Sequence, residues 1–256
     1  MYNTFSDDYD RFVNWKNRLA FEMPFIEKTV SQARRETANP AVLDAACGTG
    51  MHAIALAKLG FSVSGADLFP EMIARAKENT AREGVNVHFE PAGFGSLEKT
   101  FGSGKMDALL CLGNSLPHVE GSAGLESAVR DFAAVLRPGG ILLLQSRNFD
   151  KVMQEKMRWM DPQAHREEEK EWIFIRFYDF DPDGYIQFNI LTLYREDAGG
   201  WQQTLRTTTL YPVLQADLEP VLQQAGFKDI RLYGSMDGSD YDRTRSENLI
   251  VTAVKY

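Results

Sequence analysis

Short apolar runs and longer amphipathic stretches take turns along the chain between Pro40 and Phe149. The short runs predict strands, and the amphipathic stretches predict helices, two of which end near Gly60 and Gly84. Because strand–helix alternation builds right-handed crossovers, the pattern predicts an α/β fold with a parallel sheet. The expected strands are Ala41–Ala46, Ser62–Ala66, Val85–Glu90, Ala108–Leu112 and Ile141–Ser146, and the expected helices are Met51–Leu59, Pro70–Glu83 and Ser122–Leu136.

The pattern differs on both sides of this region. Apolar residues recur at helical spacing from about Phe5 to Ala38 and are interrupted by Pro24, which predicts two helices lying over the core. The segment Lys151–Glu171 is charged and predicts a further helix. Three β-rich runs separated by turn sequences then predict an antiparallel meander. These runs are Trp172–Phe180, Tyr185–Tyr194 and Trp201–Tyr211, and the core pattern returns with a helix at Gln215–Ala225 and strands at Asp229–Tyr233 and Asn248–Val254.

The chain therefore divides into three expected parts. Residues 1–38 are an N-terminal helical cover, residues 39–149 together with 212–256 form the α/β core, and residues 150–211 are an inserted β-rich unit. A length of 256 residues with 44% hydrophobic residues suits one such domain with an insertion.

The net charge and the cysteines limit the possible binding partners and cellular compartment of the protein. The formal net charge of −8 argues against nucleic acid, because phosphate binding needs a basic surface. The two cysteines, Cys47 and Cys111, fall in predicted strand or turn segments, which argues against a disulfide framework and favours a reducing compartment. The first ten residues do not resemble a signal peptide, and no apolar run approaches the length of a membrane span. We therefore expect a cytoplasmic protein that binds neither membranes nor nucleic acid.

The most informative segment is Val42–Gly50, in which an apolar run ends in Asp44 and is followed by small residues and two glycines. This order predicts a strand, a tight turn and a helix whose N-terminal amides face a ligand. Residues Gly48–Ala53 also satisfy the dinucleotide pattern G-x-G-x-x-A, so a nicotinamide cofactor is one interpretation. Asp44 favours another, because a carboxylate there would repel a pyrophosphate and attract an ammonium group. S-adenosylmethionine carries such a group beside its sulfonium.

The later strands also end in residues suited to binding, because ligands of open α/β sheets lie beyond the carboxyl ends of the strands. Asp67 could accept hydrogen bonds from both hydroxyls of a ribose, or could cap the helix that starts at Pro70. Phe94 follows the third strand and would flank an adenine, or else be an ordinary core aromatic.

Two further strand ends carry polar groups. Asn114 and His118 follow the fourth strand and would form a polar floor beneath the reacting atoms, although a lone histidine is more often structural. Arg147 ends the fifth strand, where its planar guanidinium would suit the carboxylate of a substrate. The alternative for Arg147 is an ion pair with an acidic side chain of the protein.

These blocks resemble the class I S-adenosylmethionine-dependent methyltransferases, and among them the chain is most similar to the glycine/sarcosine N-methyltransferases. The resemblance implies a Rossmann-like sheet with helices on both faces, and it makes the inserted antiparallel meander a substrate lid. The blocks that carry it are LDAACGTG (Leu43–Gly50), GFSVSGAD (Gly60–Asp67), LCLGNSLPH (Leu110–His118), RPGGILLLQSRNFD (Arg137–Asp150) and YDRFVNW (Tyr9–Trp15).

The resemblance also implies which residues bind the cofactor. The turn after the first strand would hold the methionine end, Asp67 the ribose, and Leu68 with Phe94 the adenine, while Arg18 would reach the cofactor carboxylate. Gly93 replaces the family's asparagine before the adenine-flanking aromatic. The full expected set is Arg18, Asp44, Ala45, Gly48, Gly50, Asp67, Leu68, Gly93, Phe94 and Leu112.

For the acceptor, the resemblance implies that Asn114 and Arg147 hold an amino-acid substrate, with His118 nearby and Tyr211 lining the pocket. The expected reaction is in-line transfer of a methyl group from S-adenosylmethionine to the amine of a small glycine- or sarcosine-like molecule, which leaves S-adenosylhomocysteine. No metal is expected. The alternatives are methylation of oxygen or carbon on another small molecule, an NAD-dependent oxidoreductase, and a cofactor-binding module without activity. The sequence leaves the oligomeric state and the number of methyl groups open.

Overall fold

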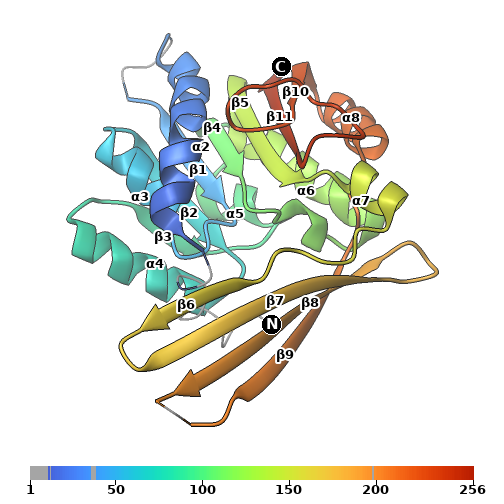
Figure 1. Ribbon diagram of the computed structural model, residues 1–256. Helices are drawn as coiled ribbons and strands as arrows, with labels where there is room; N and C mark the ends of the chain where they lie inside the picture. The colour runs from blue at the N-terminus through green and yellow to red at the C-terminus, as the bar shows by residue number, and fades with distance from the viewer. Residues whose placement is uncertain (1–10, 12, 36–38, 198) are drawn as a thin grey trace.

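The computed structural model describes residues 11, 13–35, 39–197 and 199–256, and Figure 1 shows its elements. Its centre is a seven-stranded sheet with the order β10-β11-β5-β4-β1-β2-β3. Parts of the segments Phe5–Ala38 and Tyr9–Trp15 lie outside the described residues. The strands are β1 (Ala41–Ala45), β2 (Ser62–Asp67), β3 (His88–Pro91), β4 (Met106–Cys111), β5 (Leu136–Arg147), β10 (Phe227–Tyr233) and β11 (Asn248–Lys255).

The sheet is mixed: the parallel pairing predicted for the strands between Pro40 and Phe149 is confirmed, and the antiparallel strand comes from the C-terminal part of the chain. Strands β1 to β5 pair in parallel, and Asp44 at the end of β1 lies opposite Gly65 on one side and Leu110 on the other. Strand β11 runs antiparallel to both β5 and β10. The reversal arises because β11 follows β10 directly, without the crossover helix that a parallel neighbour requires. The carboxyl ends of β1 to β5 still meet at one edge, where the sequence predicts the ligand-binding residues.

Helices cover both faces of this sheet. Adjacent residues of β1 show why, because Val42 and Leu43 point to opposite faces and both are fully buried. Val42 packs with α2 (Trp15–Val30), α3 (Met51–Lys58) and α4 (Pro70–Glu83), whereas Leu43 packs with α5 (Leu97–Phe101), α6 (Gly121–Val135) and α8 (Gln215–Gln224). Short 3₁₀ turns, η2 (Ser31–Arg35) and η3 (Leu116–His118), complete the core.

The prediction of two helices separated by Pro24 is wrong, because α2 continues through the proline. The lost backbone hydrogen bond is compensated by packing, since Ile26 and Val30, which follow Pro24 in the same helix, are fully buried against the sheet. The Thr29 hydroxyl also donates a hydrogen bond to the Phe25 carbonyl at 2.8 Å. Asn14 caps the start of the helix through its side chain.

A separate four-stranded antiparallel sheet follows α7 (Phe149–Glu155) and lies across the lower end of the core in Figure 1. The three predicted meander strands are present. The helix predicted over Lys151–Glu171 is wrong, because α7 ends at Glu155 and Pro162 disfavours helix at Asp161. The remaining charged residues form an extra edge strand. The sheet has the order β6 (Gln163–Glu167), β7 (Lys170–Phe180), β8 (Ile186–Glu196) and β9 (Gln202–Leu210).

The pleat of this second sheet directs alternate side chains toward the core. Tyr178 lies opposite Phe188, and both pack around Phe149 of α7, where Tyr178 is 2% exposed. The same alternation places Arg176 on the face that carries Tyr178. The function of this sheet as a substrate lid, and the three-part division of the chain, stay predictions.

Gly50 illustrates how tightly the turn after β1 packs. Its φ is +82°, and an added Cβ would lie 2.9 Å from the buried Phe89 ring. We expect Gly50→Ala to lower the free energy of unfolding by about 2–4 kcal/mol, measured by urea denaturation. Gly60→Ala is the matched control, because Gly60 has a similar φ of +84° with nothing within 4 Å of its Cβ position. Equal losses in the two variants would contradict a packing role for Gly50.

Candidate active site

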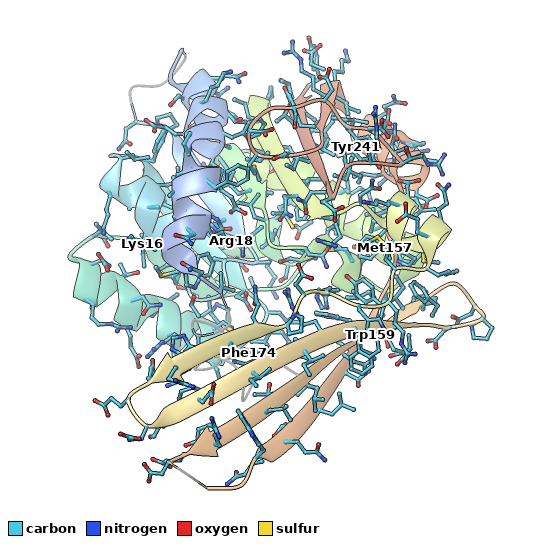
Figure 2. All side chains as sticks on the ribbon, in the orientation of Figure 1. Lys16, Arg18, Met157, Trp159, Phe174 and Tyr241 are labelled. Atoms are coloured by element: carbon cyan, nitrogen blue, oxygen red, sulfur yellow. The ribbon has the colours of Figure 1, made fainter. Side chains whose placement is uncertain are left out.

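A cavity of about 960 Å³ lies between the carboxyl ends of the core strands and the four-stranded sheet. Residues from α2, from the loops after β1 to β5 and from β6 to β9 contribute to its lining. Figure 2 labels Arg18, one of the lining residues, near the lower end of α2. The cavity has the position at which open α/β sheets bind their ligands.

Asp67 organises the glycine turn at one end of the cavity. Its carboxylate accepts hydrogen bonds from the backbone N–H groups of Gly48 at 2.9 Å and Phe69 at 3.0 Å. Burial raises the pKa of Asp67, although these two hydrogen bonds act in the opposite direction. Both Gly48 and Asp67 line the cavity. The N-cap alternative is not realised, because Phe69 is the N-cap residue of α4 and no side chain caps the helix.

Asp44 lies behind this turn and is 1% exposed. Its Oδ2 atom is buried and has no hydrogen-bond partner among the described residues. Burial raises the pKa of Asp44 to about 6, and the nearby Asp67 carboxylate adds to the shift, whereas His52 and Arg18 oppose it. A buried carboxylate oxygen without a donor is unfavourable unless a ligand supplies one. Two neighbouring carboxylates make this end of the cavity suited to a cation.

Arg18 is held in place by a short polar chain between α2 and α3. Its guanidinium contacts Glu22 at 3.0 Å, and Glu22 contacts the His52 ring at 2.7 Å. Burial acts to raise the pKa of Glu22, but the hydrogen bond with His52 and the charge of Arg18 outweigh it and lower the pKa. Trp15 packs edge-on against His52 at 5.5 Å. Arg18 therefore lies at the cavity as a positioned cation close to the two carboxylates.

The third strand end forms the side wall. Phe94 lines the cavity and packs edge-on against Phe132 at 5.2 Å, so it is both a wall residue and part of the core. Leu68 is 65% exposed and lies opposite Gly93, where an added Cβ would meet Leu68 Cδ1 at 2.8 Å. The absence of a side chain at Gly93 therefore lets the Leu68 side chain pack against the backbone there, and Leu68, Gly93 and Phe94 all line the cavity.

The opposite end of the cavity is lined by amides and arginine. Asn114, in a left-handed conformation at φ 63°, accepts a hydrogen bond from the Arg147 backbone N–H at 2.9 Å through its side-chain oxygen. Gln145 accepts a bond from Gly113 N–H at 2.7 Å and donates one to Asn248 at 3.2 Å. The ends of β4, β5 and β11 are thereby fixed together. Asn114 and Gln145 both line the cavity.

His118 lines the same end, in the 3₁₀ turn η3. Burial lowers the pKa of His118 to about 4. The imidazole is therefore neutral near pH 7 and is too weak a base to act as a strong proton acceptor. Its suitable function is to orient a ligand by hydrogen bonding.

The expected site residues are only partly brought together. Nine line the cavity: Arg18, Gly48, Asp67, Leu68, Gly93, Phe94, Asn114, His118 and Arg147. Asp44, Ala45 and Leu112 are buried and are not among the lining residues, and Gly50 packs against Phe89. Tyr211 does not line the cavity, because its backbone pairs with Pro117 at 2.8 Å and its ring lies beside Tyr185.

Several lining residues were missed by the sequence analysis. The second sheet contributes Arg176, Tyr178 and Thr208 from three positions that the pleat brings to one face, and α2 contributes Glu22. Alternation along β7 could have indicated Arg176 and Tyr178 as residues of one face. Nothing in the sequence showed that this face would turn toward the cavity.

Comparison with known proteins agrees with this geometry. Residues 42–140 match the methyltransferase domain family. The glycine/sarcosine N-methyltransferase of Aphanothece halophytica is 29% identical over 238 residues, which cover 90% of this chain and 80% of that protein. The glycine/sarcosine N-methyltransferase of Parasynechococcus marenigrum is 35% identical over 150 residues, covering 59% of this chain and 51% of that protein. The chain thus matches about half the length of the second relative.

Among solved structures, an S-adenosylmethionine-dependent methyltransferase from Clostridium acetobutylicum superposes with a TM-score of 0.77. The superposition covers 99% of this chain and 98% of that one at 17% identity, so it shows the shared fold. The chain belongs to the class I S-adenosylmethionine-dependent methyltransferases, with distant homology to the glycine/sarcosine N-methyltransferases. The predicted class, its cofactor and the Rossmann-like core are confirmed, and the residues that bind the cofactor stay a prediction.

Two further observations concern membrane-spanning helices and metal-binding clusters. In the described part of the chain, none of the helices combines the length and the apolar character needed to cross a bilayer. Within the same residues, histidine, cysteine and acidic side chains do not gather into a group of three that could hold a metal ion.

Proposed function

We propose that the protein transfers the methyl group of S-adenosylmethionine to the amine of a small amino-acid-like acceptor. The observation that carries the proposal is the polarity of the cavity, which has buried carboxylates at one end and Arg147 with amides at the other. A cationic cofactor and an anionic acceptor would occupy these ends. The named relatives act on glycine and sarcosine, which supports an acceptor that carries both an amine and a carboxylate.

The residues at the carboxylate end fit S-adenosylmethionine. The unpartnered Asp44 Oδ2 would accept a hydrogen bond from the ammonium group, and Arg18 would contact the cofactor carboxylate. Asp67 would bind the ribose hydroxyls while it holds the Gly48 turn. Leu68 and Phe94, which both line the cavity, would flank the adenine. The cofactor supplies an electrophilic methyl group on its sulfonium, and the protein supplies position and dryness.

The other end would bind and orient the acceptor. Arg147 would hold its carboxylate, and the Asn114 amide and His118 would orient its amine. The amine must be neutral to react, because an ammonium group has no lone pair. Proximity to a positive sulfonium lowers the pKa of an ammonium group, so its proton is released to water without a dedicated strong base. The weakly basic His118 is consistent with such a mechanism.

The alternatives make different demands on the site. Methylation of oxygen or carbon on an uncharged molecule would not need Arg147, and a module without activity would bind the cofactor but show no transfer. The presence of both Arg147 and Asn114 in the cavity lining favours an acceptor that carries an amine and a carboxylate over both alternatives. Tyr211 is not among the lining residues. We therefore propose that Tyr178, which is buried and lines the cavity, is the tyrosine of the acceptor pocket.

Replacing Arg147 by alanine tests the acceptor half. We expect Arg147→Ala to raise KM for glycine or sarcosine by about 10- to 100-fold, because a charge-assisted bond to the carboxylate is lost. The affinity for S-adenosylhomocysteine should stay within about twofold of the original value, since the cofactor half is untouched. Steady-state kinetics and calorimetric titration measure the two quantities. An unchanged KM would favour an acceptor without a carboxylate.

A further inference from the structure

Glu22 connects two nitrogen donors at the cofactor end of the cavity. Its carboxylate accepts hydrogen bonds from Arg18 Nε through both oxygens, at 3.0 and 3.1 Å, and its Oε2 atom lies 2.7 Å from the His52 ring nitrogen Nε2. Arg18 and Glu22 lie one turn apart on α2, whereas His52 is the second residue of α3. Arg18 and Glu22 line the cavity, and His52 is not among the described lining residues. The chain of contacts therefore runs from a core helix to the cavity.

The contact between Glu22 and His52 is shielded from water. The Glu22 side chain is 12% exposed and the His52 side chain 6% exposed. Although burial acts to raise the pKa of Glu22, the contacts with His52 and Arg18 prevail and the net shift of this pKa is downward. Glu22 is therefore ionised near pH 7 and can only accept hydrogen bonds, so the His52 Nε2 atom is the donor. A shielded, charge-assisted hydrogen bond of this kind fixes both partners more firmly than an exposed one.

Trp15 restricts the same two side chains. Its ring packs edge-on against His52 with the centroids 5.5 Å apart, and the Arg18 guanidinium carbon lies 5.1 Å from the centre of the Trp15 ring. A guanidinium near an aromatic ring is attracted to it. Arg18 is thus held by both a carboxylate and an aromatic ring. The rotamer entropy that an arginine loses on binding a ligand is then lost during folding instead, which favours binding.

Asp44 is a competing partner for Arg18. In addition to burial, the charges of His52 and Arg18 act on the pKa of Asp44, so the three groups lie within electrostatic reach of one another. A direct ion pair between Arg18 and Asp44 would neutralise the two groups to which the proposed function assigns the carboxylate and the ammonium group of the cofactor. Glu22 gives Arg18 a different carboxylate, and His52 fixes the position of that carboxylate. The two recognition groups are thereby kept separate.

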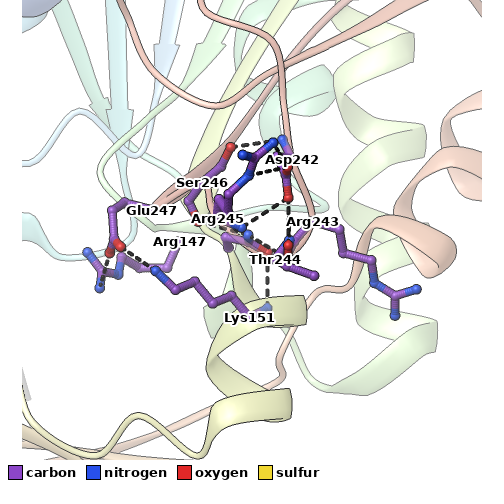
Figure 3. A network of polar contacts seen from close by, with 9 residues as sticks. Arg147, Lys151, Asp242, Arg243, Thr244, Arg245, Ser246 and Glu247 are labelled. Atoms are coloured by element: carbon purple, nitrogen blue, oxygen red, sulfur yellow. Dashed lines mark hydrogen bonds and ion pairs between the residues drawn. The ribbon is translucent and has the colours of Figure 1, made fainter.

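Arg147, at the other end of the cavity, has a looser arrangement. Its side chain lies 3.5 Å from Glu247, and Lys151 contacts the same carboxylate at 2.6 Å, as Figure 3 shows. The Glu247 side chain is 53% exposed, compared with 12% for Glu22. An exposed ion pair contributes little, because water and salt screen it. Of these two arginines, Arg18 is the one whose acidic partner is shielded.

We propose that Glu22 and His52 are positioning residues for the amino-acid end of the cofactor. His52 orients Glu22, and Glu22 holds Arg18. Arg18 is thereby kept from pairing with Asp44, so that each binds its own group of the cofactor, Arg18 the carboxylate and Asp44 the ammonium group. This inference rests on the proposed function, and it deepens that function by adding two residues that act through Arg18.

Two ligands that differ at this end isolate the effect without requiring turnover. S-adenosylhomocysteine carries the amino-acid chain, whereas methylthioadenosine keeps the adenosine and the sulfur but lacks the carboxylate and the ammonium group. Calorimetric titration gives the ratio of the two dissociation constants. We expect Glu22→Gln to reduce the preference for S-adenosylhomocysteine by about five- to tenfold, while the affinity for methylthioadenosine changes by less than about twofold. Glu247→Gln, the same change at the glutamate beside Arg147, is the matched control and should leave the ratio unchanged.

Further variants connect the effect to His52 and Arg18. His52→Phe keeps a ring beside Trp15 but removes the donor, so it should reduce the preference for S-adenosylhomocysteine by a factor close to that of Glu22→Gln. His52→Gln keeps an N–H donor and should restore part of the preference. In an Arg18→Ala background, Glu22→Gln should change the preference by less than about twofold, because Glu22 acts through Arg18. Retained binding of methylthioadenosine confirms that each variant is folded.

The outcomes separate the positioning role from the proposed function. An unchanged ratio in Glu22→Gln, or equal weakening of both ligands, would overturn the positioning role, since equal weakening is what a merely structural residue would give. The expected ratios without methyl transfer to any amine would support the positioning role and contradict the proposed function. Methyl transfer to an amino acid, with an unchanged ratio in Glu22→Gln and His52→Phe, would support the function and reject the positioning role.

Discussion

Replacing Asp67 by alanine is expected to weaken S-adenosylhomocysteine binding by about 100-fold or more, to below detection at ordinary calorimetric concentrations. Asp67 is the acceptor for two backbone N–H groups, those of Gly48 and Phe69, and its carboxylate also faces the cavity. The substitution therefore removes a ligand contact and releases the glycine turn at once. Titration of the purified variant measures the effect.

Two controls make this result specific. Asp67→Asn keeps the shape and one acceptor oxygen, so its loss of affinity should lie between those of the original protein and the alanine variant. Asp183→Ala removes an exposed carboxylate in the turn between β7 and β8 and should leave the affinity unchanged. An Asp67→Ala variant that binds S-adenosylhomocysteine as the original protein does would contradict the cofactor site.

Replacing Asp44 by asparagine is expected to separate stability from binding. Burial raises the pKa of Asp44 from the ordinary value of 3.8 to about 6. Because its pKa is higher in the folded than in the unfolded state, the ionised carboxylate lowers the free energy of unfolding. This loss of stability is absent below the ordinary pKa and complete above about pH 6. Asp44→Asn should therefore raise the free energy of unfolding of the ligand-free protein by about 1–3 kcal/mol near pH 8. Urea denaturation measures this gain.

The same substitution should weaken S-adenosylhomocysteine binding by about 10- to 100-fold, because the ammonium group loses its charged acceptor. The stability gain should shrink as the pH falls below about 6, where Asp44 in the original protein becomes neutral. Affinity of the original protein should fall over the same interval, and the variant should lack this inflection. A variant that is less stable at about pH 8 and binds normally would mean that Asp44 is an ordinary structural acid.

The sequence predicted the core because its local signals agree with the tertiary structure. The strand ending in Asp44, the glycine turn and the helix from Pro70 each have one dominant pattern, and the structure places them within a residue or two. The helix break predicted at Pro24 is absent, because burial of Ile26 and Val30 outweighs the loss of one backbone hydrogen bond. The helix predicted before β7 is absent as well, since the charged residues of an edge strand resemble those of an exposed helix.

The site residues also fall into those that local sequence signals could predict and those that depend on tertiary packing. Residues at strand ends, such as Asp67, Asn114 and Arg147, could be predicted because parallel strands all deliver their ends to one edge. Arg176 and Tyr178 could not, because their place depends on how the second sheet docks on the core. Tyr211 directly follows β9, and its ring lies beside Tyr185 and not in the cavity lining, which again depends on the placement of the second sheet.

The most direct test of the account is transfer of a labelled methyl group from S-adenosylmethionine to a panel of small amino acids, with the product identified by mass spectrometry. The panel should include glycine, sarcosine, dimethylglycine, aspartate and glutamate, together with hydroxylated compounds that lack an amine. We expect label on the nitrogen of at least one amino acid, and loss of this label in Arg147→Ala at low acceptor concentration. Label on oxygen or carbon, or no transfer by protein that binds S-adenosylhomocysteine tightly, would contradict the account.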